Sequence, residues 1–283
     1  MPSLRELRKH LKSITTTEQL AGAMKTVSAA KFSRISAVLE GYRPYADTCR
    51  GLLDRFGSQL AEVMPCVNPD APVCYVVMAS NRGLCGGYNI MLLDFADEQL
   101  AAVTEPYTLV ACGKMAIAHF EGKADREFVL PDVPDYSSSA EFCDYLRKAY
   151  TNGEVSAVYL IYQDFVNMLT QTPVCERLLP LADVPDAADE RPEPDDDMLY
   201  VPDRETVLRN SCLSCVNASL YSVILESAAG AQAATLMAMR SAYDNAQESS
   251  AALETVISRK RQSEVTASVL ETSSDNNSMN NPQ

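Results

Sequence analysis

Residues 203–271 read DRETVLRNSCLSCVNASLYSVILESAAGAQAATLMAMRSAYDNAQESSAALETVISRKRQSEVTASVLE, a stretch with no proline and a single glycine, Gly230. So long a run without a helix breaker predicts one continuous α-helix. At 1.5 Å per residue this helix would be on the order of 100 Å long if unbroken. A single domain does not need a helix of that length to cover its own core. The stretch therefore predicts a rod that extends beyond the domain.

The first 60 residues predict a second long helix. Leu4, Leu7, Leu11 and Ile14 recur at alternating steps of three and four residues, and a less regular apolar series continues to Tyr42. A repeat near 3.5 residues forms a narrow apolar seam that another helix must cover. Two rods at the two ends of one chain, with a domain between them, suggest a part that reaches into something else.

Composition narrows the class of protein. The 283 residues are 47% hydrophobic, which allows one or two domains with a real core. The formal net charge of −14 argues against nucleic acid as a partner, because phosphate binding needs a basic surface. The nine cysteines follow no repeating spacing, and the pair Cys212 and Cys215 has no second pair beside it. This pattern favours reduced cytosolic thiols packed in a helix over a zinc or redox site.

The N-terminus lacks the apolar core of a signal peptide, and no apolar run approaches the ~18 residues of a membrane span. We therefore expect no direct insertion into a membrane, and any membrane association to depend on partners.

Residues 70–202 show the pattern of a Rossmann-like α/β domain, because short β-branched runs alternate there with helical segments. We expect strands at 72–78, 107–112, 127–130, 155–162 and 173–181, and helices at 88–103, 114–120 and 139–150. Ser138 or Ser139 is the expected cap of the last helix. Prolines among acidic residues predict a surface loop over 182–202, and the polar residues 272–283 predict a disordered tail.

A glycine-containing turn, with Gly83, Gly86 and Gly87, follows the first expected strand. A Rossmann-like fold binds phosphate at such a position, but the spacing G-x-x-G-G differs from G-x-G-x-x-G. Neither His10 nor His119 has an evident nucleophile or carboxylate partner. The sequence thus favours a tight strand-to-helix turn, with no catalytic residue, cofactor or metal. Two alternatives stay open: a Rossmann-like nucleotide-binding enzyme with helical extensions, which a nucleotide-affinity measurement would identify, and a free-standing coiled-coil scaffold.

Several segments together resemble the gamma subunit of F-type ATP synthases. Residues 18–31 (EQLAGAMKTVSAAK) are similar to its N-terminal form TxQITKAMKMVAAAK, and residues 80–89 (SNRGLCGGYN) to its loop SDRGLCGGFN. Residues 162–167 (YQDFVN), with Gln171 and 178–181 (LLPL), resemble its YNKFVN…Q…LLPL stretch. Further matches in the C-terminal stretch are Met237, Ala238, Met239, Asp244, Asn245, Arg261, Gln262 and Thr266. The matches follow the family's order over about 270 residues, and this order makes the resemblance specific.

This resemblance implies that the two terminal helices wrap into a long antiparallel coiled coil. The coil would lie in the central cavity of a hexamer of alternating alpha and beta subunits, and the α/β domain would meet the epsilon subunit and the membrane ring of c subunits. Ion flow would turn the ring and this shaft together, and the shaft would drive the hexamer's catalytic sites through different states. The chain itself would be non-catalytic and peripheral, on the cytoplasmic side of a bacterial cell membrane.

Two groups of residues carry over to this sequence from the resemblance. The expected hexamer-interface and coupling residues are Met24, Lys25, Lys31, Met239, Arg261, Gln262 and Thr266. The expected residues of the turn in the α/β domain are Arg82, Gly83, Gly86 and Gly87. The chain departs from the family at Thr235, where Arg is usual, and at Ala267 and Ser268, which replace Gln and Glu. Whether the coupling ion is a proton or sodium stays open.

The resemblance also implies a register for the coil. If Met24 lies near residues 237–239, the numbers of antiparallel partners sum to about 260, and Leu11 lies near residues 246–252.

Overall fold

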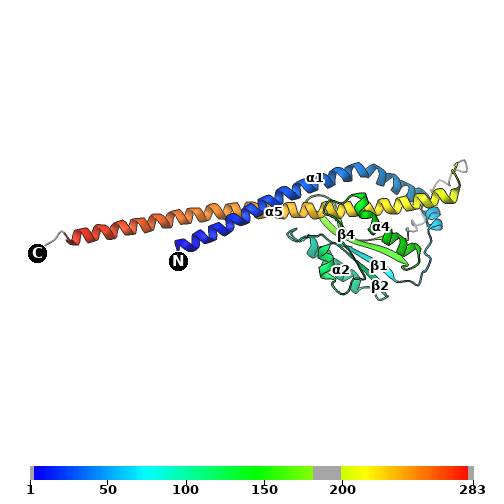
Figure 1. The fold of residues 1–283 in the computed structure, drawn as a ribbon, viewed down its shortest axis with the longest axis horizontal. Helices are drawn as coiled ribbons and strands as arrows, with labels where there is room; N and C mark the ends of the chain where they lie inside the picture. Colours follow the sequence, from blue (N-terminus) through cyan, green and yellow to red (C-terminus); the bar gives the residue numbers. More distant parts are fainter. Residues whose placement is uncertain (1–2, 181–198, 280–283) are drawn as a thin grey trace. The chain divides into compact units, whose positions relative to one another are not determined.

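A computed structural model describes residues 3–180 and 199–279, and the side chains of all of these except 53–62 and 271–279. The expected acidic loop, residues 182–202, therefore lies outside the described residues except for 199–202. The chain forms two compact units. The coil unit consists of residues 1–27 and 238–283, and the head unit consists of residues 28–237. Figure 1 shows the course of the chain.

Two very long helices, α1 (Leu4–Val63) and α5 (Arg204–Met279), contribute to both units. At the start of α1 the Ser3 N–H donates to Glu6 Oε2 at 2.7 Å, and the Glu6 N–H donates to Ser3 Oγ at 3.2 Å. These reciprocal bonds satisfy N–H groups that the first turn of a helix leaves without a partner. The two helices predicted from the sequence are thus confirmed.

The end of α5 differs from the prediction. We expected the helix to end at residue 271 and a disordered tail to follow over 272–283, but α5 continues to Met279. The polar composition of this tail was misleading, because no glycine follows Gly230 and no proline lies between Pro202 and Pro282. Without either breaker, serine, asparagine and aspartate lower helix propensity by only a few tenths of a kcal/mol each, about 0.5 on average.

Within the coil unit the two helices run antiparallel, as the resemblance implied. The ring of Tyr243 on α5 lies against α1, since a Cβ on Gly22 would come within 3.2 Å of it and the Lys25 ammonium lies 4.0 Å from its centroid. Closer to the N-terminus, hydrogen bonds at the helix start and, to a lesser extent, Lys260 hold the pKa of Glu6 below its usual value. Residue numbers therefore rise along one helix as they fall along the other.

The contacts of Tyr243 give antiparallel partners whose numbers sum to about 265–268, five to eight more than the expected sum of about 260. This offset is roughly 8–12 Å along the helix axis. A sum of about 260 would place Tyr243 opposite about residue 17, whereas its ring contacts α1 further along the helix. Met24 still lies about three residues from the position opposite Met239, but Leu11 lies opposite about residue 255 instead of 246–252.

The head unit contains a five-stranded sheet in the order β3-β2-β1-β4-β5, in which β5 alone is antiparallel among the described strands. The strands are β1 (Val73–Met78), β2 (Tyr107–Cys112), β3 (Arg126–Phe128), β4 (Ala157–Phe165) and β5 (Gln171–Leu179). The connecting helices are α2 (Tyr88–Ala101), α3 (Lys114–His119) and α4 (Tyr136–Thr151). This arrangement confirms the expected Rossmann-like, largely parallel sheet.

The cap of α4 is Asp135, not Ser138 or Ser139 as the sequence suggested. The Ser138 N–H donates to Asp135 Oδ1 at 2.7 Å, and the Asp135 N–H donates to Ser138 Oγ at 3.1 Å. Ser138 is therefore the third helical residue of a capping box, and the helix begins earlier than its apolar series indicated.

Helices cover both faces of the sheet, as a doubly wound fold requires (Figure 1). On one face, α4 and α5 supply Phe142, Leu146, Cys212 and Leu220 to a large apolar cluster. On the other face, α2 and α3 pack against β1, β2 and β4. The part of α1 in this unit packs against α5, where fully buried Ile35 is in one cluster with Leu225. The head unit thus includes the adjoining segments of both long helices.

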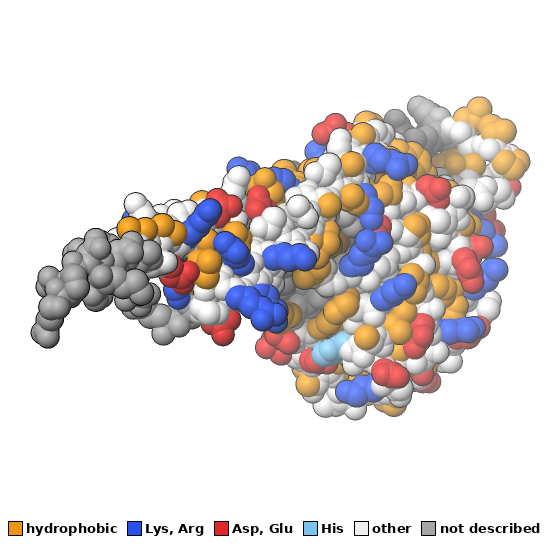
Figure 2. Space-filling view, turned by 60° about the vertical axis from the view of Figure 1, so that its left-hand side comes forward, with side chains coloured by type: hydrophobic (Ala, Val, Ile, Leu, Met, Phe, Trp, Pro, Cys, Tyr) orange, Lys and Arg blue, Asp and Glu red, His pale blue; other side chains and the backbone are white. Residues whose placement is uncertain are grey.

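The surface of the molecule is mixed. On the face shown in Figure 2, apolar side chains are scattered among acidic and basic ones. Among the described helices, α5 is long and apolar enough over one stretch to span a membrane, but 61% of that stretch is buried inside the protein. This burial is typical of the core helix of a folded domain. Cys212 and Cys215 belong to that core, with Cys212 Sγ 3.6 Å from Met64 Sδ.

Candidate functional site

The turn after β1 is held in one conformation by a buried asparagine, Asn89, at the start of α2. Its Oδ1 accepts the Ser80 N–H at 3.1 Å, and its Nδ2 donates to Ser80 Oγ at 2.8 Å and to the Arg82 carbonyl oxygen at 3.3 Å. Leu84 and Gly86 have left-handed φ angles of 64° and 60°. Among the expected turn glycines, Gly86 is thus the one whose backbone favours glycine.

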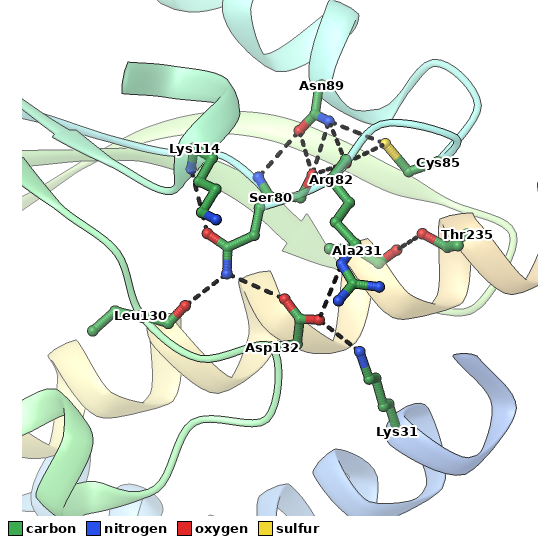
Figure 3. Close-up of polar contacts among 11 residues, drawn as sticks. Lys31, Ser80, Arg82, Cys85, Asn89, Lys114, Leu130, Asp132, Ala231 and Thr235 are labelled. Atoms are coloured by element: carbon green, nitrogen blue, oxygen red, sulfur yellow. Dashed lines mark hydrogen bonds and ion pairs between the residues drawn. The ribbon is translucent and has the colours of Figure 1, made fainter. Parts of the chain in front are cut away.

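Asp132, in the segment between β3 and α4, joins this turn to α1 (Figure 3). Its Oδ2 accepts from Lys31 Nζ at 2.6 Å and lies 3.8 Å from Arg82 Nε, while its Oδ1 accepts from Asn81 Nδ2 at 3.1 Å. Asn81 Nδ2 also donates to the Leu130 carbonyl oxygen at 2.7 Å. Three segments far apart in the sequence therefore meet at one carboxylate.

The surroundings of Asp132 favour its charged form. Burial by itself would raise the pKa of this carboxyl, but the hydrogen bonds from Lys31 and Asn81 and the charges of Lys31 and Arg82 outweigh burial and hold the pKa below its usual value. The side chains of Lys31 and Asp132 are 24% and 18% exposed. The pair is therefore less screened by solvent than an ordinary surface ion pair.

This arrangement gives Lys31 a partner within the chain. The resemblance implied that Lys31 contacts the hexamer, and in the structure its ammonium pairs with Asp132. Asp132 was missed, because a contact between residues 101 positions apart leaves no periodic signal. The clue in the sequence was an aspartate between Pro131 and Pro134, four residues after the end of a short strand.

The carboxyl ends of β1 and β2, where α/β sheets bind ligands, are closed in this protein. A Cβ on Gly113, which has φ of 91°, would lie 2.0 Å from the Ala79 carbonyl oxygen. On α5, Ser227 Oγ lies 3.4 Å from the Met78 carbonyl oxygen and donates to it. The cavity left between these elements has a volume of about 50 Å³, whereas sites for small molecules usually have 300–1,000 Å³. The geometry therefore does not favour the nucleotide-binding alternative at this position.

The remaining expected coupling residues lie in the coil unit. Met24 is half-buried and Met239 is buried, whereas Arg261, Gln262 and Thr266 are exposed. Of the expected residues, the structure thus brings Lys31 and Arg82 together around Asp132 and places the coil residues in a different compact unit.

The three positions at which the sequence departs from the family pattern all lie on α5. Thr235 donates from its hydroxyl to the Ala231 carbonyl oxygen at 2.8 Å, and Ala267 and Ser268 are exposed on α5.

The chain thus combines two long terminal helices with a doubly wound α/β domain that lies between them in the sequence. The family model described as "ATP synthase" matches residues 3–278. The ATP synthase gamma chain of Desulforudis audaxviator is 33% identical over 287 residues, covering 96% of this chain and 97% of the relative. That of Anaeromyxobacter sp. is 34% identical over 285 residues with the same coverage. The chain belongs to the ATP synthase gamma chain family.

Solved structures agree with the fold. A chain of the Euglena gracilis mitochondrial ATP synthase, in the structure of OSCP, F1 and c-ring, has a TM-score of 0.63 at 15% identity and covers 98% of this chain. A chain of the Tetrahymena thermophila mitochondrial ATP synthase, in the structure of central stalk and c-ring, has a TM-score of 0.58 at 21% identity. This second match covers 79% of this chain and 99% of that chain.

Proposed function

We propose that this chain is the central rotary shaft of a bacterial F-type ATP synthase. In this proposal, ion flow through the membrane c-ring turns the chain inside a hexamer of alpha and beta subunits and so drives ATP synthesis, and ATP hydrolysis turns it in reverse. The observation that carries the proposal is the antiparallel pairing of the two terminal helices, which presents one continuous coil to a partner.

The coil unit suits a bearing inside another assembly, because it leaves apolar side chains exposed. Those at least 47% exposed are Leu20, Val27, Val256, Val265, Val269 and Leu270. In the proposal these exposed side chains are covered by a partner protein. The alpha and beta subunits provide that contact, and the coupling residues Met24, Lys25, Met239, Arg261, Gln262 and Thr266 lie within it.

The head unit has the complementary role. Its helices cover both faces of its sheet. In the proposal this packed domain receives torque from the c-ring and binds the epsilon subunit. The closed carboxyl edge supports a non-catalytic role for the chain, with the nucleotide sites in the hexamer. The chain would be peripheral on the cytoplasmic side of the membrane.

Purification from native membranes tests this proposal. A peptide tag inserted at Gly122, an exposed turn with no other atoms near its Cβ position, should leave the fold intact. We expect alpha, beta, epsilon and c subunits to co-purify with the tagged chain in mild detergent, and not from cells with untagged chain. Recovery of the tagged, folded chain without alpha and beta subunits would contradict the proposal.

A further inference from the structure

The turn after β1 contacts both long helices within the head unit, and it does so through different residues. Towards α1, Asp132 connects the turn residues Asn81 and Arg82 to Lys31. Towards α5, the contact is made by Tyr88, the first residue of α2. The same short segment of the head therefore touches the two helices that continue into the coil unit.

The contact with α5 is a buried hydrogen bond. Tyr88 is only 3% exposed, and its hydroxyl donates to the Ser227 carbonyl oxygen at 2.9 Å. Ser227 Oγ, which lies 3.3 Å from the same hydroxyl, donates to the Met78 carbonyl oxygen at the end of β1. Burial raises the pKa of the Tyr88 phenol, so the hydroxyl keeps its proton and stays a donor.

The shape of α5 fits this ring closely. Gly230, the one glycine of α5, faces Tyr88, because a Cβ at that position would lie 3.2 Å from Tyr88 Cε2. Behind the ring, fully buried Gln163 on β4 donates from Nε2 to the Tyr88 carbonyl oxygen at 3.0 Å. Tyr88 is thus fixed from the sheet on one side and from α5 on the other. The family loop quoted above has Phe at this place, which cannot make the hydroxyl bond.

From this geometry we propose that Lys31–Asp132 and Tyr88–Ser227 form a two-point clamp, by which the head holds α1 and α5 separately. The four residues are positioning residues for energy coupling: they keep the head from turning relative to the shaft helices under load. Apolar packing already holds α5 on the sheet and α1 on α5. The two polar contacts add a directional constraint on each helix, which apolar packing by itself does not supply. This inference rests on the proposed function, since it assigns the residues through which the head passes torque.

The clamp can be tested in inverted membrane vesicles that carry the complete complex. Two quantities are compared: the rate of ATP hydrolysis and the ATP-driven membrane potential. A potential-sensitive dye reports the membrane potential, and it responds to the transport of either protons or sodium ions. The variants are Lys31→Met, which removes the charge on α1, Tyr88→Phe, which removes the hydroxyl alone, and the double variant. Asp132→Asn and the pair Lys31→Met/Asp132→Asn show whether Lys31 acts through Asp132.

We expect each single variant to lower the ratio of potential generation to hydrolysis by less than about twofold, and the double variant to lower it by about tenfold or more, beyond the product of the singles. Lys31→Met/Asp132→Asn should be no worse than either change alone, because both remove the same contact. Lys31→Arg should retain the ratio. The matched control is His119→Ala with Tyr107→Phe, elsewhere in the head. It removes the 2.7 Å contact of His119 Nε2 with Asp97 Oδ2, a carboxylate partner that the sequence did not indicate, and the hydroxyl of an exposed tyrosine.

Three outcomes would overturn the clamp. In the first, the double variant loses no more than the product of the single losses. In the second, one single variant alone abolishes coupling, so that a single contact carries the load. In the third, hydrolysis and potential fall by the same factor, so that the contacts only maintain assembly. Failure of the proposed function is a separate result, because wild-type vesicles would then hydrolyse ATP without any potential that depends on this chain.

Discussion

Glu226 is a partly buried carboxyl on α5 with other carboxylates facing it. Burial, followed by the negative charges of Asp164 and Glu176, raises its pKa from 4.5 to about 7, while Arg50 and Arg43 oppose the shift. The group therefore binds its proton more tightly in the folded chain than in the unfolded one. The contribution of Glu226 to folding stability should therefore be highest below pH 4.5. It should fall as pH rises from about 4.5 to about 7.

The substitution Glu226→Gln tests this linkage, since the amide has a similar shape and no charge. At pH 8 we expect the variant to be more stable than the wild type by about 1–2 kcal/mol, after allowance for solvent screening of a partly exposed group, and at pH 4 to be equal to it. Urea unfolding of both proteins across this range measures the difference. Glu40→Gln, on an exposed part of α1, is the control. A difference that stays constant with pH would rule out the assignment.

At the scale of the element, the packing of α1 on α5 in the head unit depends on a few buried side chains. Ile35 is fully buried beside Leu39, Tyr221, Leu225 and Ala229. Ile35→Ala removes three methyl or methylene groups and leaves a cavity, so we expect a loss of about 2–5 kcal/mol in the free energy of unfolding. The measurement is denaturant unfolding of the purified chain.

The control for this prediction is Val38→Ala one turn along the same helix, at a position that is 42% exposed. It should change stability by less than about 1 kcal/mol, since little apolar surface is buried there. Equal losses at the two positions would show that this cluster does not hold α1 against α5.

The elements themselves were largely predictable from sequence, and the reasons are local. The strand predicted at 107–112 matches β2, because a short β-branched run bounded by polar residues is typical of a buried strand. The strand expected at 155–162 begins and ends too early, since β4 is Ala157–Phe165. The sequence did not indicate its last residues, because two of them are polar and belong to the strand through their pairing with β5. The start of α4 was misplaced because Ser138 and Asp135 are both good caps, and only the backbone geometry selects between them.

The site was less predictable, because its contacts join distant segments. Arg82 and Lys31 were identified through the family resemblance, but nothing in the sequence indicated that both face Asp132. Nor did composition predict that Tyr88 reaches Ser227, 139 residues away. The offset of the coil register has the same cause, since the register depends on where the Tyr243 ring meets Gly22.

At the scale of the whole molecule, the two compact units should differ in local stability. β4 lies in the interior of the sheet, with Val158, Leu160 and Ile161 almost fully buried. Described residues 261–270 of α5 are all exposed. Helical hydrogen bonds with few buried apolar contacts open easily. In the isolated chain, we therefore expect amide hydrogens of 261–270 to exchange much faster than those of β4 at equal pH and temperature. Exchange at equal rates would contradict this view of the coil unit.

The central claim is that the chain turns as a shaft, and rotation of single molecules tests it most directly. The alpha–beta hexamer would be fixed to a surface, and a visible probe would be attached to Glu121→Cys, an exposed position in the head unit. The native cysteines, of which Cys66 and Cys175 are only partly buried, would first be replaced. If the chain turns as a shaft, the probe should rotate continuously in one direction while ATP is present and should stop when ATP is exhausted. A probe that stays still while the same complexes hydrolyse ATP would contradict this claim.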